Sequence, residues 1–492
     1  MTADANQSPM ESLATAPSPP AEEEHAPKAQ VGYFQLTFLI YGAACGGAFG
    51  LEGMVSQGPG LAIFLIALVP FIYSVPLSLV VSELTAMMPV EGGNYRWSRF
   101  AFGNLMGFQA GWWAWLSGVV ASASYAALFT EYINTWVPRP TEAAYAWWAN
   151  HGLACLAPET GSAVLTPLAH WGCCLFLIWL MHYLNVKGID VVGDSAAIMT
   201  FLLLLPFAIM LAIGITHWNA NPLVPFIAPG KGWLDLGVAL STVIWVYSGY
   251  DKLSAAAEEV RDPQKTFPPA LFTAATLAML SCLLPTVAAV ATLNDWAEWT
   301  DGFFPAACLK MAGPWLQTWM VVGGLISNAL LLSVTMLSSS RVLFAMAADG
   351  LMPQALTRRH PVSQTPVASI LWGSLLLSAL TLFSFKQLLI IYLYLQMYTN
   401  LLIYVNAWRL RSSHPTMERP FKLPGGQIGI VALSLPTVVL ALAAMICAVF
   451  PNQVFDRLQF AYAMVATLSG FVLYPLLARN RASSQASAEG VA

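Results

Sequence analysis

Long apolar stretches recur along the sequence and constrain the fold more than any other feature. The hydrocarbon core of a bilayer is about 30 Å thick, so a helix needs roughly 20 apolar residues to cross it. Twelve stretches reach that length: 33–55, 60–85, 104–132, 166–185, 192–215, 233–256, 268–292, 317–343, 367–385, 387–408, 428–449 and 458–477. Only 9% of the residues are charged, against about 25% in soluble domains. The sequence therefore predicts an all-α membrane protein with twelve transmembrane helices, and it excludes a water-soluble enzyme.

The two ends of the chain depart from this pattern. Residues 1–30 are rich in Ala, Pro, Ser and Glu, residues 481–492 are polar and small, and neither segment has an apolar run. This composition predicts disordered tails on either side of a twelve-helix domain at 31–480. Basic residues predict the orientation, because loops rich in Lys and Arg stay in the cytoplasm. Sixteen of the 21 Lys and Arg residues fall on the side that carries both ends, so we expect a multi-pass protein of the cell membrane with both termini cytoplasmic.

Two of the spans contain residues that disfavour a continuous helix. The segment 41–53 (YGAACGGAFGLEG) has five glycines, and each costs about 1 kcal/mol relative to Ala inside a helix. In the sixth span, Ser248 and Gly249 interrupt the segment 245–251 (WVYSGYD). Close helix packing through small residues is the alternative for the first segment, but such packing needs no carboxylate like that of Glu52. Irregular backbone inside a bilayer is tolerated where it lines a cavity, so we predict that helices 1 and 6 are broken.

Each predicted break opens a block of five spans. The blocks cover 33–215 and 233–411, and two further helices follow at 428–477. Paired broken helices in matching positions of two halves indicate an inverted-repeat transporter, in which substrate and coupling ion bind near the middle of the bilayer. The sequence predicts a 5+5 inverted repeat plus two C-terminal helices.

Acidic residues near the breaks are the strongest candidates for function. A carboxylate at the bilayer centre costs roughly 2.5–3.5 kcal/mol, so it is functional by default. We expect Glu52, Glu131 and Asp251 to converge on one cavity, with Glu52 and Glu131 as proton carriers and Asp251 as an amine ligand. The alternative for each is a buried acid bonded to backbone donors at a break. Glu83, beside a basic loop, is expected to form a structural ion pair instead.

The charge balance predicts the kind of ligand. The central thirds of the spans contain no Lys or Arg, so these carboxylates are expected to be uncompensated and to bind a protonated amine, a proton or sodium. Half-helix ends and aromatic rings complete an amine site by dipole and cation–π contacts. The remaining predicted substrate-binding residues are Gly46, Gly47, Phe49, Trp245, Ser248, Gly249 and Tyr250. Tyr250 is also a candidate gate.

Four segments resemble the amino acid–polyamine–organocation (APC) superfamily. They are SELTAMMPVEGGNYRWSRFAFGNLMGFQAGWWAWLSG (82–118), YDKLSAAAEEVRDPQKTFPPAL (250–271), SSSRVLFAMAADGLMP (338–353) and RPFKLPGG (419–426). Three shorter segments are similar to its polyamine–proton symporter branch: GAFGLEG (47–53), GFQAGWWAWLSGVV (107–120) and LFTEYI (128–133). The resemblance implies alternating access, a substrate between helices 1, 3, 6, 8 and 10, and a coupling-ion site between helices 1 and 8 to which Ser338 and Ser339 contribute hydroxyls.

The sequence departs from that branch at two places. Ala121 stands where those permeases commonly carry an acid, and Tyr250 stands where they usually carry a Trp before the helix 6 acid. Helix 5 also lacks the lysine that replaces sodium in some proton-driven relatives in the superfamily. A binding site with fewer acidic residues is expected to select less strongly for a long polycation.

We expect a secondary active transporter that imports polyamines or related cationic amines, coupled to protons, with sodium as the alternative ion. The alternative function is an amino-acid permease or exchanger for neutral or cationic amino acids. There the helix end near Gly46 would hold the substrate carboxylate and Asp251 its amine, although Glu52 would repel that carboxylate. We expect no cofactor, metal site or nucleic-acid partner, and the sequence indicates no obligatory protein partner; the bilayer is the expected environment.

Overall fold

The computed structural model describes residues 31–136, 167–300, 302–383, 385–450 and 455–489. These residues form an all-helical bundle, and their only β-type pairing is an isolated bridge between Val31 and Val260. Eight of the helices are long and apolar enough to cross a membrane. The predicted tail at 1–30 lies outside the described residues.

The first half of the bundle contains α2 (Tyr33–Ala44), α3 (Glu52–Val55), α4 (Pro59–Val69), the π-turn η1 (Pro70–Ser74), α5 (Val75–Met87), α6 (Asn94–Phe102), α7 (Asn104–Trp136), α9 (Pro167–Lys187) and α10 (Ile189–Thr216). The second half contains α11 (Trp233–Val246), η3 (Lys252–Glu259), α12 (Pro263–Leu293), η4 (Trp296–Glu298), α13 (Phe304–Ala312), α14 (Pro314–Ala348), η5 (Gln354–Thr357), α15 (Val367–Leu380), α16 (Phe385–Ser413), α17 (Gly426–Ala448) and α18 (Arg457–Glu489). Each of the twelve predicted spans overlaps one helix or consecutive helices, and the number of membrane crossings stays a prediction.

Helix α18 continues to Glu489, beyond its apolar span. It enters the segment 481–492, for which a disordered tail stays a prediction. The residues from 481 to 489 include Ala, Arg, Gln and Glu, which have high intrinsic helix propensity. Lengthening an existing helix needs no new nucleation, so these residues can continue α18 beyond its apolar span.

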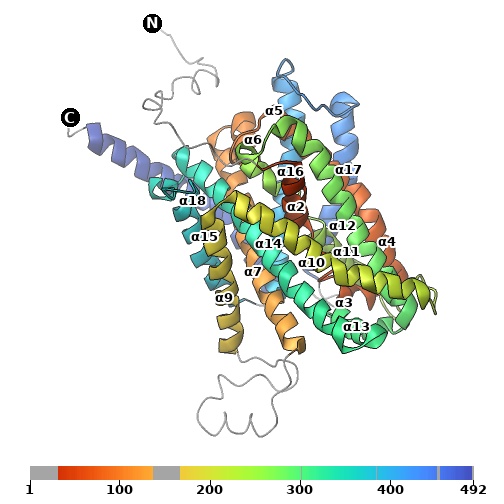
Figure 1. Cartoon of the computed structure of the whole chain (residues 1–492). Helices are drawn as coiled ribbons and strands as arrows, with labels where there is room; N and C mark the ends of the chain where they lie inside the picture. The colour runs from red at the N-terminus through yellow and green to blue at the C-terminus, as the bar shows by residue number, and fades with distance from the viewer. Residues whose placement is uncertain (1–30, 137–166, 301, 384, 451–454, 490–492) are drawn as a thin grey trace.

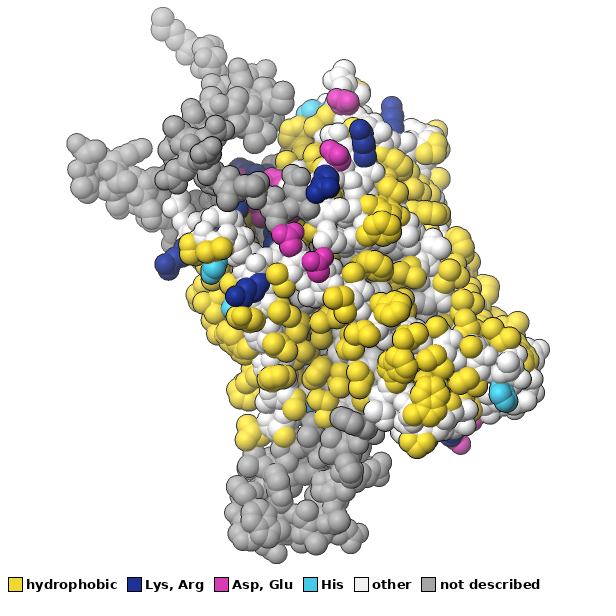
Figure 2. Space-filling model, viewed as in Figure 1, with side chains coloured by type: hydrophobic (Ala, Val, Ile, Leu, Met, Phe, Trp, Pro, Cys, Tyr) yellow, Lys and Arg dark blue, Asp and Glu magenta, His cyan; other side chains and the backbone are white. Residues whose placement is uncertain are grey.

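Helix α14 lies at the centre of the bundle, and α17 and α18 lie at its periphery (Figure 1). In the most apolar 18-residue stretch of each helix, 83% of the residues are buried in α14, compared with 22% in α17 and 17% in α18. Helix α14 packs against α7, α10, α2 and η3. Figure 2 shows hydrophobic side chains over the middle of the visible face, and most of the charged side chains near one end. This distribution suits a bundle surrounded by hydrocarbon and flanked by water.

Both broken helices are interrupted inside the segments predicted to be irregular. Helix α2 ends at Ala44 and α3 begins at Glu52, while α11 ends at Val246 and η3 begins at Lys252. Within these gaps Gly47 has φ 90° and Gly249 has φ 112°. A residue with a Cβ atom rarely adopts these angles, so the glycines make both interruptions possible.

Segment η3 is held by backbone hydrogen bonds from two sides. Val31 N donates to Glu259 O at 3.0 Å, and Arg261 N donates to Val31 O at 3.0 Å. From the loop between α5 and α6, Gly92 N donates to Ala255 O at 3.0 Å. The chain after the second break is therefore fixed in place, although it is not a regular α-helix.

Glu83 forms a structural ion pair, as the sequence predicts, but with different partners. Its carboxylate accepts from Arg411, with Arg411 Nε at 2.7 Å from Oε1, and from Leu423 N at 2.8 Å. Arg96 and Arg99, which lie in α6, instead contact Asp349, at 2.6 and 2.5 Å. Glu83 thus joins α5 to α16 and to the segment before α17.

Candidate functional site

The two breaks contact each other near the centre of the bundle. A Cβ atom at Gly249 would lie 2.5 Å from the carbonyl oxygen of Ala43, at the end of α2. A Cβ atom at Gly50 would lie 2.7 Å from Cζ3 of Trp245, near the end of α11. Gly249 therefore allows a close approach of two backbone segments, Gly50 leaves room for the Trp245 ring, and residues 43–50 and 245–249 share one region.

Asp251 is buried at the second break and belongs to a polar network between helices. Its side chain is 6% exposed, and Oδ1 accepts a hydrogen bond from Gln396 Nε2 at 3.1 Å. The network continues from Gln396 Nε2 to Asn400 Oδ1 at 2.9 Å, and from Asn400 Nδ2 to the Tyr73 hydroxyl at 2.6 Å. The Tyr73 and Ser248 hydroxyls lie 2.8 Å apart. We call these five residues the central polar network.

Three members of this network, Gln396, Asn400 and Tyr73, were missed by the sequence analysis. Gln396 and Asn400 come from α16, and Tyr73 comes from η1. A pair of amides four residues apart in an apolar helix places both side chains on one helix face, and this spacing was a usable signal. Tyr73 carried no such signal, because a tyrosine in an apolar span is ordinarily a packing residue.

Glu52 is fully buried at the first break, and donors from the protein engage both of its oxygens. Gly50 N donates to Oε2 at 2.7 Å, and the Tyr132 hydroxyl donates to Oε1 at 2.8 Å. Glu52 is also the first residue of α3, where a helix favours an acid. These contacts match the structural alternative, a buried acid bonded to donors at a break.

The expectation that the acids are uncompensated is wrong at Asp251. Lys252, the next residue, is only 7% exposed, and it interacts electrostatically with Asp251. Its Nζ lies 5.3 Å from the centroid of the Tyr392 ring and has no hydrogen-bond partner among the described residues. In an unbroken helix Lys252 would lie near the end of the span, within reach of water. The break instead leads the chain into η3, which is enclosed by protein.

The structure does not bring Glu131 together with the other two acids. Glu131 is exposed near one end of α7, while the next residue, Tyr132, is fully buried and bonds to Glu52. Consecutive residues on a helix differ by about 100° around its axis. Tyr132, and not the predicted Glu131, is therefore the residue of α7 that faces the first break.

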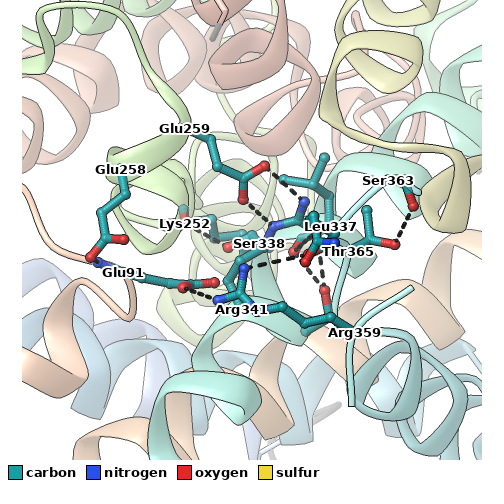
Figure 3. Close-up of polar contacts among 12 residues, drawn as sticks. Glu91, Lys252, Glu258, Glu259, Leu337, Ser338, Arg341, Arg359, Ser363 and Thr365 are labelled. Carbon is teal, nitrogen blue, oxygen red and sulfur yellow. Dashed lines mark hydrogen bonds and ion pairs between the residues drawn. The ribbon is translucent and has the colours of Figure 1, made fainter. Parts of the chain in front are cut away.

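The serines of α14 contact both breaks, but not as the resemblance implies. Ser338 Oγ donates to the carbonyl of Lys252 at 2.5 Å, so it contacts helix 6 (Figure 3). Ser339 Oγ donates to Met336 O at 3.3 Å, within its own helix. The hydroxyl that reaches helix 1 belongs to Ser327, which donates to Gly46 O at 2.5 Å.

Aromatic side chains enclose both breaks. Phe49 lies against Tyr132 and Phe207, with ring centroids 5.3 and 4.8 Å apart. Trp245 lies against Tyr125 and Phe385, at 5.9 and 5.6 Å. Tyr250 is fully buried, and its hydroxyl has no hydrogen-bond partner among the described residues. Polar tips inside an aromatic enclosure suit a ligand with an apolar body and a polar or cationic head.

Comparison with known proteins identifies the class of this molecule. The amino acid permease family matches residues 31–472. A probable polyamine transporter of Arabidopsis thaliana is 32% identical over 91% of this chain and 86% of its own length. Polyamine transporter PUT1 of Oryza sativa subsp. japonica is 32% identical over 91% of this chain and 78% of its own length. Branched-chain amino acid permease BcaP of Bacillus subtilis (strain 168) is 27% identical over 82% and 85%. The chain therefore belongs to the amino acid permease family of the APC superfamily, and it is a membrane transporter, not an enzyme.

Proposed function

We propose that this protein imports polyamines or related small cationic amines, driven by a proton gradient. The observation that carries the proposal is Asp251, a carboxylate buried at the second break and bonded to a neutral amide of another helix. A buried carboxylate without a full ion pair favours a cation strongly, because the low dielectric strengthens the attraction. The ammonium group of an amine is such a cation.

The proposed architecture has twelve membrane crossings, made of two five-helix inverted repeats and two further helices. Both termini lie in the cytoplasm of a cell-membrane protein, on the side that carries most of the basic residues. The two interruptions support this arrangement because they occur in the first helix of each proposed repeat and contact each other. Relative movement of the repeats then exposes the centre to each side in turn.

The polyamine class is supported by the names of the plant relatives. Proton coupling is assigned to Glu52 and Glu131, with sodium as the alternative ion. Glu52 supports this assignment by its position, since its carboxylate connects the first break to α7 through Tyr132. A change in its protonation alters a contact between two helices, and such a contact is a means of coupling a proton to movement.

Amino acids are the second candidate substrates, and Lys252 is the observation that favours them. A buried ammonium beside Asp251 gives the site one charge of each sign. An α-amino acid also carries one charge of each sign and can pair with both. A relative named as a branched-chain amino acid permease agrees with this alternative.

Transport by the full-length protein in proteoliposomes tests the proposal. With an acidic outer solution, labelled putrescine and spermidine should accumulate, and uptake should collapse when a protonophore is added. Asp251→Asn should reduce uptake at least about tenfold, because it removes the charge that binds the ammonium. Asp194→Asn is the matched control, since Asp194 is exposed and accepts a hydrogen bond from Gln35 Nε2 at 2.8 Å. Uptake restricted to zwitterionic amino acids would overturn the cationic-amine proposal, and unchanged uptake by Asp251→Asn would remove Asp251 from the site.

A further inference from the structure

Two cysteine thiols are in contact at the first break. Cys45 directly follows α2, and Cys282 lies on α12. Their Sγ atoms are 3.5 Å apart, and both side chains are buried. Each sulfur also lies within hydrogen-bonding distance of the Gly47 carbonyl oxygen, at 3.4 Å for Cys45 and 3.5 Å for Cys282. The two thiols and this carbonyl therefore form one compact group.

This thiol pair joins the two halves of the bundle. Helices α2 and α12 pack against each other, and the Tyr41 hydroxyl donates to Ser281 Oγ at 3.0 Å. The second break also lies close by, because a Cβ atom at Gly249 would lie 3.4 Å from Cα of Ala44, the residue before Cys45. A covalent bond between the two sulfurs would therefore fasten the first break to α12, close to the point where the two breaks meet.

We propose that Cys45 and Cys282 are a modification site, at which hydrogen peroxide forms a reversible disulfide that arrests transport. A disulfide has an S–S distance of about 2.05 Å, so the sulfurs must approach further from their present contact, and two short side chains share this movement. Cys308 provides a contrast, because the sulfur beside it belongs to a thioether, Met210 Sδ at 3.8 Å, which cannot form a disulfide.

The reaction balances with peroxide as the oxidant. The sulfur of one cysteine attacks a peroxide oxygen, the O–O bond breaks, and a sulfenic acid forms; the released hydroxide takes the proton of that thiol and leaves as water. The second sulfur then attacks the sulfenic sulfur, so that the S–S bond forms and the S–O bond breaks. The second hydroxide leaves as water with the proton of the second thiol. The two sulfurs together lose two electrons, which the two peroxide oxygens gain.

Peroxide reaches the thiols when the centre opens. Both sulfurs are enclosed by protein in this structure, whereas alternating access opens the centre to water on each side in turn. Hydrogen peroxide is a small polar molecule and can follow water to the first break. This access rests on the proposed mechanism of transport, but the disulfide does not depend on the identity of the cargo.

The test exposes the full-length protein in proteoliposomes to hydrogen peroxide and then blocks the remaining thiols with N-ethylmaleimide. Mass spectrometry of the digested protein should detect the peptides of Cys45 and Cys282 joined to each other. Uptake of labelled putrescine should fall in proportion to the joined fraction and should return when dithiothreitol is added. The return distinguishes the disulfide from oxidised methionine, which needs a dedicated reductase.

Two serine variants locate the effect. Cys282→Ser keeps a small side chain that can donate to the Gly47 carbonyl, but it removes one sulfur of the pair. Peroxide should leave its uptake at the level of the same variant before treatment. Cys308→Ser is the matched control, because it removes a buried cysteine outside the pair, and its uptake should stay as sensitive to peroxide as that of the wild type.

The outcomes separate this inference from the proposed function. Absence of the joined peptide after peroxide treatment overturns the inference, and so does full uptake by protein in which the disulfide has formed. Equal peroxide sensitivity of Cys282→Ser and the wild type also overturns it, and if Cys282→Ser does not fold, the joined peptide and its reversal in the wild type decide. If the protein transports no amine or amino acid, the proposed function fails, while the joined peptide and a raised thermal transition of the oxidised protein would still support the disulfide.

Discussion

Neutralising Glu83 should destabilise the bundle more than neutralising an acidic residue on the surface of the bundle. The Glu83 side chain is 2% exposed and that of Arg411 is 6% exposed, and the two are joined by paired hydrogen bonds. Leu423 N also donates to Glu83 at 2.8 Å, and Arg419 Nε lies 3.6 Å away. Removing one partner of a buried ion pair costs about 3–5 kcal/mol, because the remaining charge stays buried without compensation. We expect Glu83→Gln to lower the free energy of unfolding by about this amount.

The matched control is Glu298→Gln, which removes an acid that pairs with Lys310 at 2.9 Å. The Glu298 side chain is 67% exposed, so water replaces the lost partner and the cost should stay below about 1 kcal/mol. The double variant Glu83→Gln with Arg411→Met should be more stable than Glu83→Gln alone, because it removes one of the two buried arginines that lose their acidic partner.

A thiol-reactive dye measures the unfolding of this chain directly. Cys45, Cys174, Cys282 and Cys308 are buried and free, so they react as the bundle unfolds on heating. Glu83→Gln should shift the transition to a clearly lower temperature, Glu298→Gln should not, and the double variant should lie between Glu83→Gln and the wild type. Equal transition temperatures for Glu83→Gln and Glu298→Gln would refute the reasoning that this ion pair is buried and structural.

Two further predictions concern the breaks. Gly249→Ala should abolish transport and lower the free energy of unfolding by at least about 1–3 kcal/mol, because φ is 112° and the new methyl would lie 2.5 Å from Ala43 O. The control Gly373→Ala, with open space around it, should keep wild-type uptake. Normal uptake by Gly249→Ala would contradict the contact between the breaks. Glu52→Gln should fold, because its amide oxygen still accepts from Gly50, but its amine uptake should lose its dependence on an imposed pH gradient; an unchanged dependence would assign proton coupling to another residue.

The sequence was sufficient to predict the helices and the places where they break. Both follow from local rules: a bilayer fixes the length of an apolar span, and glycine clusters disfavour a continuous helix. The gaps at 45–51 and 247–251 therefore lie inside the predicted irregular segments. These features need no knowledge of which helices are neighbours.

The contacts of the site could not be predicted in the same way, because they depend on how each helix is rotated in the bundle. Glu131 and Tyr132 differ by one position, yet the first is exposed and the second is bonded to Glu52. Ser327 and Ser338 are three turns apart on α14, and one reaches helix 1 while the other reaches helix 6. Packing, rather than residue type, decides which of these side chains faces the centre.

The two buried acids differ in a way that bears on their roles. Glu52 accepts from Gly50, within its own break, so part of its stabilisation is local and survives movement of neighbouring helices. Asp251 accepts from Gln396 of α16, and Gln396 in turn contacts Asn400, which contacts Tyr73 of η1. In the proposed site, an ammonium at Asp251 would add a charged partner to a carboxylate that already accepts from Gln396, within a network that joins three separate segments. Such a contact, made in one arrangement of α16 and the second break and not in the other, is what a ligand needs in order to shift a conformational equilibrium.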